Sequence, residues 1–453
     1  MLFLALTLWI ATPGPATTEV AAHAGEQELG FDELDRVLLN RKAMSEEGRA
    51  ALQYLIQTEV LRSLAEERGV QVTAVELNGR WSELDQALRS SGVEGGLLEE
   101  VRSQRMSPEA FRELLALAIV HERLTRDALG LAPDAVVSGD QQTIWIEQEI
   151  AKRQFSAPPP PWTDGICARS GDIRISADDY SELLRRQLAA EDIREICLQM
   201  LLVKHMLAAM PDLSAEARAA AVEAEIDRRH ASADANPAYK GVGYEELLRA
   251  QGVVVAALPE DPSIIAAALA TLWVDRTHGE AGLRRTYEEE RTYFEDRYGE
   301  ALNTRLLFLG AARRTNELQQ RSFEVARGLL EKWSAEIGSE VDFATLAGER
   351  SDDPYTKRMG GELGWVTRGD PAVPENLREA LFGYLEGNEL PTSGALVGPF
   401  ELENGVALAW ISARRASPAW EEMKQHVHRE LRGRFATDLM APASLITYLD
   451  ESP

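Results

Sequence analysis

The residues that could carry out chemistry are few in this sequence, and their spacing excludes several common kinds of active site. The chain contains no GxSxG, HExxH, GxGxxG or Walker motif, which mark hydrolases, zinc proteases and nucleotide-binding proteins. His426 and His428 are two residues apart on an expected helix, so they point to different faces and are poor co-ligands for one metal ion. His121 and His205 lie in amphipathic helices, where a histidine at the edge of the core is the simpler interpretation. The sequence therefore predicts no metal site and no cofactor.

The composition is that of a globular protein with an acidic surface. Of 453 residues, 45% are hydrophobic and 27% charged, and 74 acidic against 48 basic residues give a formal net charge of -26. Such a surface repels phosphate backbones, so we expect no nucleic-acid partner. The charge is compatible with partner chains that carry some positive charge. The length predicts more than one domain.

Residues 1–24 predict an export signal. Residues 2–11 form an apolar run that is too short to span a bilayer as a helix. The sequence AHA at 22–24 fits an A-x-A cleavage pattern. A disordered apolar tail is the alternative. We expect no membrane span in the mature chain, because no other stretch is long and apolar enough.

The two cysteines, Cys167 and Cys197, leave two interpretations open. They could pair as a disulfide in an oxidising compartment. Alternatively both are unpaired, with Cys197 buried in a helix.

Apolar residues from Leu29 to about Gly130 recur at helical spacing. Ser45 is expected to cap one helix that Gly69 ends, and Ser107, followed by proline, is expected to cap another. The sequence predicts a helical module at 28–150.

A second module follows a proline-rich stretch. Four successive prolines forbid a helix, so residues 151–165 are predicted to be an extended linker and a domain boundary. Beyond it, ISADDYSELL from Ile175 resembles LGFDELDRVL from Leu29, a shift of 146 residues. We interpret this as a diverged duplication that places a second helical module at 166–300. Coincidence between two amphipathic helical stretches is the alternative.

The pattern changes again near residue 301. NTRLLFLGA, GGELGWVTRG and GVALAWISARR are strand candidates, and PENLREALFGYL is a helix candidate between them. These predict a compact α/β domain at 301–418, followed by a C-terminal helix at 419–453. The expected fold class is α+β, with mainly helical N-terminal modules, then the α/β domain and the C-terminal helix.

The segment from Arg305 to Arg415 resembles the parvulin (PpiC-type) family of peptidyl-prolyl cis-trans isomerases. The resemblance rests on several elements in the family's order, namely DFATLA at 342–347, Ser351-Asp352, GGELGW at 360–365, Ala380 with Phe382 and Gly387, and Gly398-Pro399 with Gly405. The helix before this segment, both helical modules and the closing helix are similar to those of SurA-like envelope chaperones.

The resemblance also implies a site. The family's two site histidines fall at Leu306 and Ala407, so neither is kept. A site carboxylate falls at Asp353, for which a solvated turn residue before Pro354 is the alternative. The substrate pocket is completed by apolar wall positions and by a position where the family has a hydroxyl group: Val373, Leu377, Phe382 and Asn404.

An isomerase of this kind lowers the barrier of about 18–20 kcal/mol to rotation about an X-Pro amide. The apolar walls are partly kept, but the polar floor is lost. The resemblance therefore implies a foldase and chaperone of the periplasm or cell envelope with weak or lost isomerase activity. It would bind unfolded or extended client polypeptides, with outer-membrane and secreted proteins as candidates. The alternatives are an active isomerase that acts on X-Pro bonds of exported proteins, and a docking role for one fixed partner.

Overall fold

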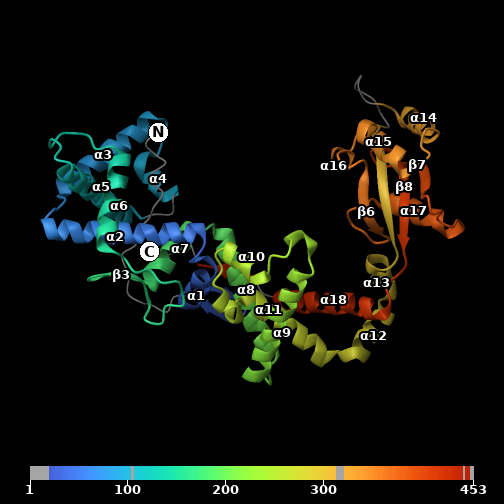
Figure 1. Cartoon of the computed structure of the whole chain (residues 1–453), viewed down its shortest axis with the longest axis horizontal. Coiled ribbons are helices and arrows are strands. Elements are labelled where there is room, and N and C mark those ends of the chain that lie inside the picture. The colour runs from blue at the N-terminus through green and yellow to red at the C-terminus, as the bar shows by residue number, and fades with distance from the viewer. Residues whose placement is uncertain (1–19, 104–106, 313–320, 442–443, 449–453) are drawn as a thin grey trace. The chain divides into compact units, whose positions relative to one another are not determined.

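In the part of the chain that the structure describes, helices make up most of the residues and the β-strands form three small sheets (Figure 1). The expected α+β class is confirmed. None of the helices in the described part of the chain is long and apolar enough to cross a membrane. The computed structural model describes residues 20–103, 107–312, 321–441 and 444–448.

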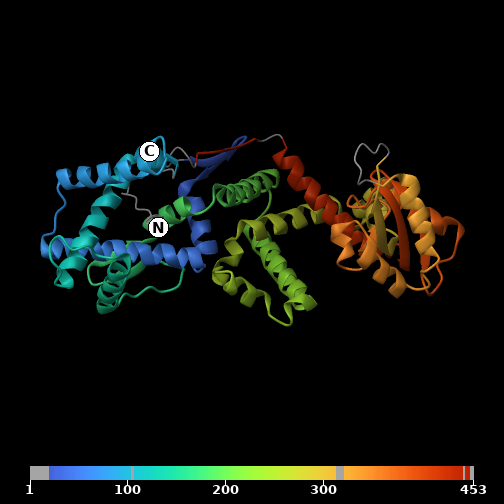
Figure 2. The same ribbon diagram turned by 90° about the horizontal axis from the view of Figure 1, so that it is seen from above.

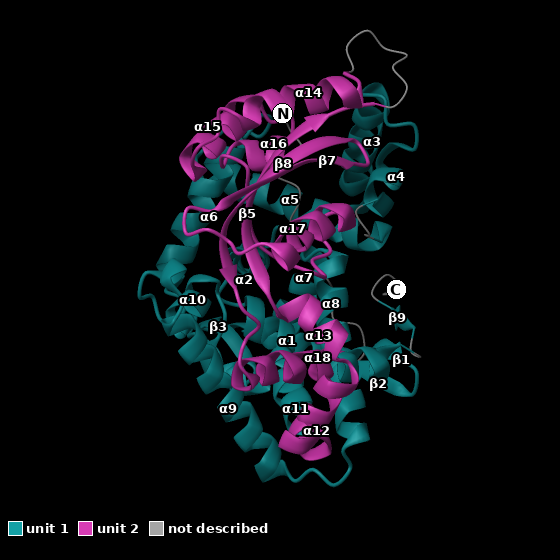
Figure 3. Cartoon of the chain, turned by 90° about the vertical axis from the view of Figure 1, so that its right-hand side faces the viewer, with its two compact units in different colours: residues 1–273, 434–453 teal, residues 274–433 magenta. Residues whose placement is uncertain are grey.

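The chain divides into two compact units (Figure 3). Unit 1 comprises residues 1–273 and 434–453, and unit 2 comprises residues 274–433. Unit 2 therefore begins before the boundary at 301 that the sequence suggests. It includes two helices ahead of the α/β domain, because these pack on the first part of the C-terminal helix. There the Tyr298 ring stacks on His426 with ring centroids 4.3 Å apart.

Unit 1 contains two helical halves that begin in the same way. The first half consists of β1 (Val20–Ala24), β2 (Gln27–Gly30), α1 (Phe31–Lys42), α2 (Glu46–Arg68), α3 (Ala74–Ser90), α4 (Gly96–Ser103), α5 (Pro108–Ala128) and α6 (Gly139–Arg153). The second consists of β3 (Ile166–Ser170), β4 (Ile173–Ser176), α7 (Ala177–Gln187), α8 (Ala190–Ala209), α9 (Ala215–Asp234), the 3-10 turn η1 (Pro237–Tyr239), α10 (Tyr244–Ala250), the 3-10 turn η2 (Val255–Glu260) and α11 (Pro262–Thr277).

The expected helix ends are confirmed. Ser45 caps α2, since its hydroxyl oxygen accepts a hydrogen bond from the Gly48 N–H at 3.1 Å. Gly69 ends α2 in the left-handed region at φ 63°. Ser107 caps α5 in the same way as Ser45 caps α2, with the Ala110 N–H as donor.

The structure extends the duplication to its strands. β1, β2 and α1 begin at 20, 27 and 31, and β3, β4 and α7 begin at 166, 173 and 177, each 146 residues later. Neither hairpin was predicted from the sequence. α2 packs with α5 and α6 in the first half, and in Figure 1 these helices lie next to it.

The two halves exchange their hairpin–helix segments. β3, β4 and α7 of the second half pack on α2 of the first, whereas β1, β2 and α1 pack on α8 of the second. Equivalent positions fill both cores, as the pairs at a shift of 146 show: Ala21/Cys167, Ala22/Ala168, Leu29/Ile175, Leu34/Tyr180, Val37/Leu183, Leu38/Leu184, Ala51/Cys197 and Leu55/Leu201.

The proline-rich segment is packed within unit 1. Ser156 forms a β-bridge with Arg169 of β3, and the Trp162 indole N–H donates to the Pro158 carbonyl at 2.9 Å. The Trp162 ring also lies 5.9 Å from that of Tyr180. Both helical halves consequently belong to one compact unit, in contrast to the domain boundary expected at 151–165.

β1 is the central strand of a sheet with order β2-β1-β9, in which β9 (Leu445–Thr447) pairs antiparallel with β1. The expected C-terminal helix is thus shorter than 419–453, because α18 (Trp420–Met440) ends before this strand. The export signal stays a prediction, and residues 1–19 lie outside the described part. The expected cleavage pattern at 22–24 lies inside β1.

The cysteines do not form a disulfide. Both are free and buried, and they lie in different cores, Cys167 beside α2 and Cys197 on α8. Burial raises the pKa of the Cys167 thiol to about 12 and that of Cys197 to about 11. The interpretation of two unpaired cysteines is therefore confirmed.

Unit 2 contains a four-stranded antiparallel sheet of order β6-β5-β8-β7, with helices on both faces (Figures 1 and 2). One face packs on α14 and α15, and the other packs on α17. The strand β7, which contains the Gly398-Pro399 pair, was missed from the sequence. The elements are α12 (Gly279–Glu289), α13 (Arg291–Tyr298), β5 (Ala301–Gly310), α14 (Phe323–Ser334), α15 (Glu340–Arg350), α16 (Pro354–Lys357), β6 (Glu362–Thr367), α17 (Glu375–Gly387), β7 (Ala395–Leu402), β8 (Gly405–Arg415) and the first part of α18.

A partly buried ion pair joins α1 to α7 inside unit 1. The Asp35 carboxylate lies 2.6 Å from the Arg185 Nε, and the Arg185 guanidinium also lies 4.5 Å from the centre of the Phe31 ring. Desolvation by burial raises the pKa of Asp35 to about 6, against the opposing effect of Arg185. A carboxylic acid with a raised pKa favours folding when it is protonated.

We expect Asp35→Asn to change how stability depends on pH. In the natural protein, protonated Asp35 contributes on the order of 3 kcal/mol to the free energy of unfolding below about pH 4. This contribution is lost as the pH rises to about 6. Urea unfolding from pH 4 to 7 would show the free-energy difference between natural protein and variant falling over that range. Asp32→Asn, on the exposed side of α1, is the control. A difference that stays constant with pH would contradict this assignment.

Candidate functional site

The two positions aligned with the family's histidines lie on neighbouring strands and face the same side of the sheet. Leu306 of β5 pairs with Ala409 of β8, and Ala407 is two residues from Ala409 on that strand. Both Leu306 and Ala407 belong to the core between the sheet and α17. The structure therefore brings these two predicted positions together.

Two aromatic side chains flank Ala407. Phe308 of β5 and Phe400 of β7 are its direct partners on the two neighbouring strands, so all three side chains lie in one row on one face. Gly405 lets the Phe308 ring lie against β8, since a Cβ there would be 2.7 Å from that ring. Sequence reasoning missed Phe308 and Phe400, because only the strand register places them beside Ala407.

The expected wall residues are also in this core, but they are almost completely covered. Val373 exposes 6% of its surface, Phe382 exposes 1%, and Leu377 exposes none. The Arg368 guanidinium lies over the Phe382 ring at 4.5 Å from its centre. Little of this wall is left for a proline ring to contact. The apolar side chains of this core that are only partly buried are Phe308, Leu363, Tyr384, Leu385, Leu390 and Phe400.

The adjacent glycines bring the loop before β6 against β5. Gly360 and Gly361 have φ of 62° and 83°, in the left-handed region that favours glycine. A Cβ on Gly361 would lie 2.5 Å from the Leu306 carbonyl oxygen, and the Leu306 N–H donates to the Gly361 carbonyl at 2.7 Å. The GGELGW motif thus fixes the loop beside the first of the two replaced histidine positions.

Asp353 lies in a second loop that is attached to β5. The Asp352 N–H donates to the Phe308 carbonyl at 2.8 Å, and the Phe308 N–H donates to the Ser351 hydroxyl at 3.2 Å. Asp353 caps α16, where its carboxylate accepts from the Thr356 N–H at 3.1 Å and from the Thr356 hydroxyl. The carboxylate is thus a helix cap next to Pro354, and its catalytic role stays a prediction.

Asn404 lies at the exposed turn between β7 and β8, where its backbone carbonyl accepts a hydrogen bond from the Ala311 N–H at 2.9 Å. This arrangement agrees with a turn residue, and its role in substrate binding is untested. The floor between Leu306 and Ala407 is apolar. It offers hydrophobic contact, but its side chains carry no group that could exchange a proton with a substrate.

The sheet and helices of unit 2, together with the loops that carry its motifs, define a parvulin-type domain. Residues 313–411 match the family model described as "Rotamase: PPIC-type PPIASE domain", which confirms the resemblance. The chain is also 32% identical over 123 residues to Chaperone SurA of Shewanella denitrificans, and this match covers 26% of each chain. The alignment thus spans about a quarter of that relative's length.

Solved structures of similar proteins include the peptidylprolyl isomerase PrsA of Bacillus cereus, with 18% identity and a TM-score of 0.26 over 59% of this chain and 84% of that one. They also include a structure from work on the SurA-like chaperones PEB4 and Cj1289 of Campylobacter jejuni, with 16% identity and a TM-score of 0.24 over 57% of this chain and 83% of that one.

We expect Asp353→Ala to destabilise unit 2 by about 1 kcal/mol, because it removes the cap of α16. Asp353→Asn keeps a side-chain oxygen at the cap and should cost much less, although it removes the charge. Urea unfolding, followed by the fluorescence of Trp365 and the other tryptophans of unit 2, measures both variants. If Asp353→Ala is as stable as the natural protein, the capping role is contradicted.

Proposed function

We propose that this chain is a foldase of the cell envelope or periplasm that holds unfolded or extended polypeptides through apolar surfaces, and that its isomerase activity is weak or lost. The observation that carries the proposal is the row of Phe308, Ala407 and Phe400, an apolar floor in a PPIC-type domain. The similarity to Chaperone SurA supports client binding as the activity.

The loss of polar groups matters because of what an isomerase must stabilise. Twisting an X-Pro amide removes its resonance, and polar groups that meet the twisted amide only in the transition state lower the barrier. Hydrophobic contact with the proline ring is made in the ground state as well, so it binds the substrate without accelerating rotation. An apolar floor with covered walls therefore favours holding a client over isomerising it.

An active isomerase is the second candidate. The retained order of the family motifs favours it, as does the position of Asp353 in the loop that is attached to β5. In that case the apolar face and this carboxylate would be sufficient for turnover.

We expect the full chain not to accelerate the isomerisation of a short X-Pro peptide, which takes about 10–100 s without a catalyst at 25 °C. A protease-free assay that follows the peptide by nuclear magnetic resonance measures the rate directly. Acceleration that Phe382→Ala or Asp353→Asn abolishes would overturn the proposal of lost activity and establish the second candidate.

We expect the full chain to suppress the aggregation of a chemically unfolded secreted protein at near-stoichiometric concentration. Light scattering after dilution from denaturant measures this, and a folded protein of similar size and net charge serves as the control for non-specific repulsion. Suppression no greater than that of the control would contradict client binding.

A further inference from the structure

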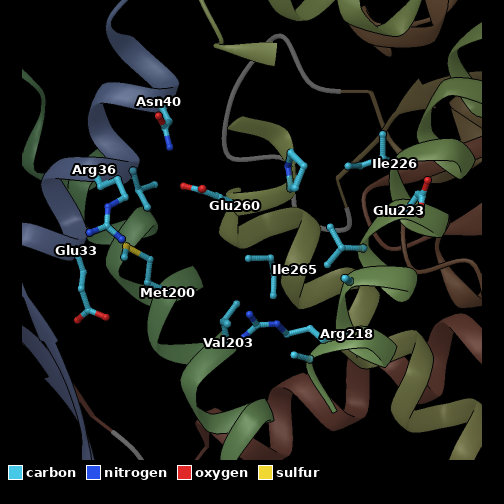
Figure 4. Close-up of a pocket in the computed structure, with 15 residues that line it drawn as sticks. Glu33, Arg36, Asn40, Met200, Val203, Arg218, Glu223, Ile226, Glu260 and Ile265 are labelled. Carbon is cyan, nitrogen blue, oxygen red and sulfur yellow. The ribbon is translucent and has the colours of Figure 1, made fainter. Parts of the chain in front are cut away.

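Unit 1 contains a groove that is separate from the parvulin-type site. It lies between α1, α8, α9, η2 and α11 and has a volume of about 620 Å³ (Figure 4). We call it the α1–α9 groove. Its size falls in the usual range for sites that bind small ligands, about 300–1,000 Å³, so it holds a few amino-acid residues rather than a folded domain.

The inner surface of the α1–α9 groove is apolar. Met200 and Val203 lie one turn apart on α8, Ile226 faces them from α9, and Ile265 faces them from α11. All four are only partly buried, although they come from three packed helices. Such a surface gains free energy when apolar side chains of a ligand cover it.

Two arginines point into this groove. In Figure 4 the guanidinium group of Arg36, from α1, lies toward Met200, and that of Arg218, from α9, lies toward Val203. Neither forms an ion pair with any residue in the described ranges, whereas Arg41 on the same helix as Arg36 is paired with Asp261 at 2.7 Å. Each of these unpaired guanidinium groups lies beside the apolar wall, where a carboxylate can accept charge-assisted hydrogen bonds from it.

The other charges of the groove limit what the carboxylate can belong to. Glu223 and Glu260 also line it and have no ion-pair partner in the described part of the chain. A ligand with several acidic groups would be repelled by these two carboxylates and by the net charge of -26. A ligand with a single carboxylate at one end and apolar residues before it fits both the arginines and the walls.

We propose that the α1–α9 groove binds the C-terminal end of an extended polypeptide, with the terminal carboxylate at Arg36 or Arg218 and the preceding apolar side chains on Met200, Val203 and Ile265. The inference rests on the proposed function, since it names the part of a client polypeptide that this groove recognises. It assigns unit 1 a role in choosing clients that is independent of the parvulin-type domain.

The test uses the full chain and a fluorescent ten-residue peptide that ends in apolar residues, made with either a free C-terminal carboxylate or an amide. Fluorescence anisotropy should show the free carboxylate binding about tenfold more tightly to the natural protein. The preference should disappear in Arg36→Gln/Arg218→Gln. It should persist in Arg68→Gln/Arg194→Gln, which changes the net charge equally but lies outside the groove. Circular dichroism confirms that both variants are folded.

Three results would overturn the proposal. Equal affinity for the carboxylate and amide peptides would exclude terminal recognition. An amidated peptide with one internal glutamate that binds as tightly as the free carboxylate would show that the groove takes internal acidic segments. A dimer of the natural protein that becomes a monomer in Arg36→Gln/Arg218→Gln would show that a second copy occupies the groove.

The proposed function can survive the failure of this inference. If both double variants suppress client aggregation as well as the natural protein does, while no peptide shows a carboxylate preference, only the role of the groove is wrong. If the natural protein neither suppresses aggregation nor binds any peptide, the proposed function fails with it.

Discussion

The architecture of unit 1 depends on the exchange of hairpin–helix segments between its two halves. The buried stripe of α2 is covered by α7, and that of α8 is covered by α1. Each buried leucine, valine or isoleucine in these cores contributes about 1.5–3 kcal/mol relative to exposure. Neither half can close its core alone, because the side chains that complete it belong to the other half. The packed segment between α6 and β3 lets one chain supply both.

The exchange also determines where the α1–α9 groove can form. α1 comes from the first half, and α8, α9 and α11 come from the second, so Arg36 faces Met200 only because α1 has crossed to α8. The Asp35–Arg185 pair joins α1 to α7. A surface built from both halves is therefore held in place by the core between α1 and α8, as binding sites on rigid elements generally are.

The sequence predicted the helices, the duplication and most of the α/β domain, because these have strong periodicity or ordered motifs. The hairpins were missed for local reasons. VAAHA has only one of the β-branched residues typical of strands, Val20, and its alanines fit a cleavage pattern. It becomes β1 because β2 and β9 pair with it. At the parvulin-type site, Leu306 and Ala407 were predicted to lie together. Phe308 and Phe400 were not found, because register across three strands depends on contacts between residues far apart in the sequence.

The apolar residues at the two positions aligned with the family's histidines explain why this domain can be stable without a polar floor. A buried imidazole requires hydrogen-bond partners, and burying it without them costs free energy. Ala407 fits between Phe308 and Phe400 with no exposed surface, whereas the two aromatic rings stay partly exposed on that face. A larger polar side chain at that position would overpack the row, at a typical cost of about 1–3 kcal/mol. The two aromatic neighbours and the small residue between them depend on each other, and together they form an apolar row within the parvulin-type fold.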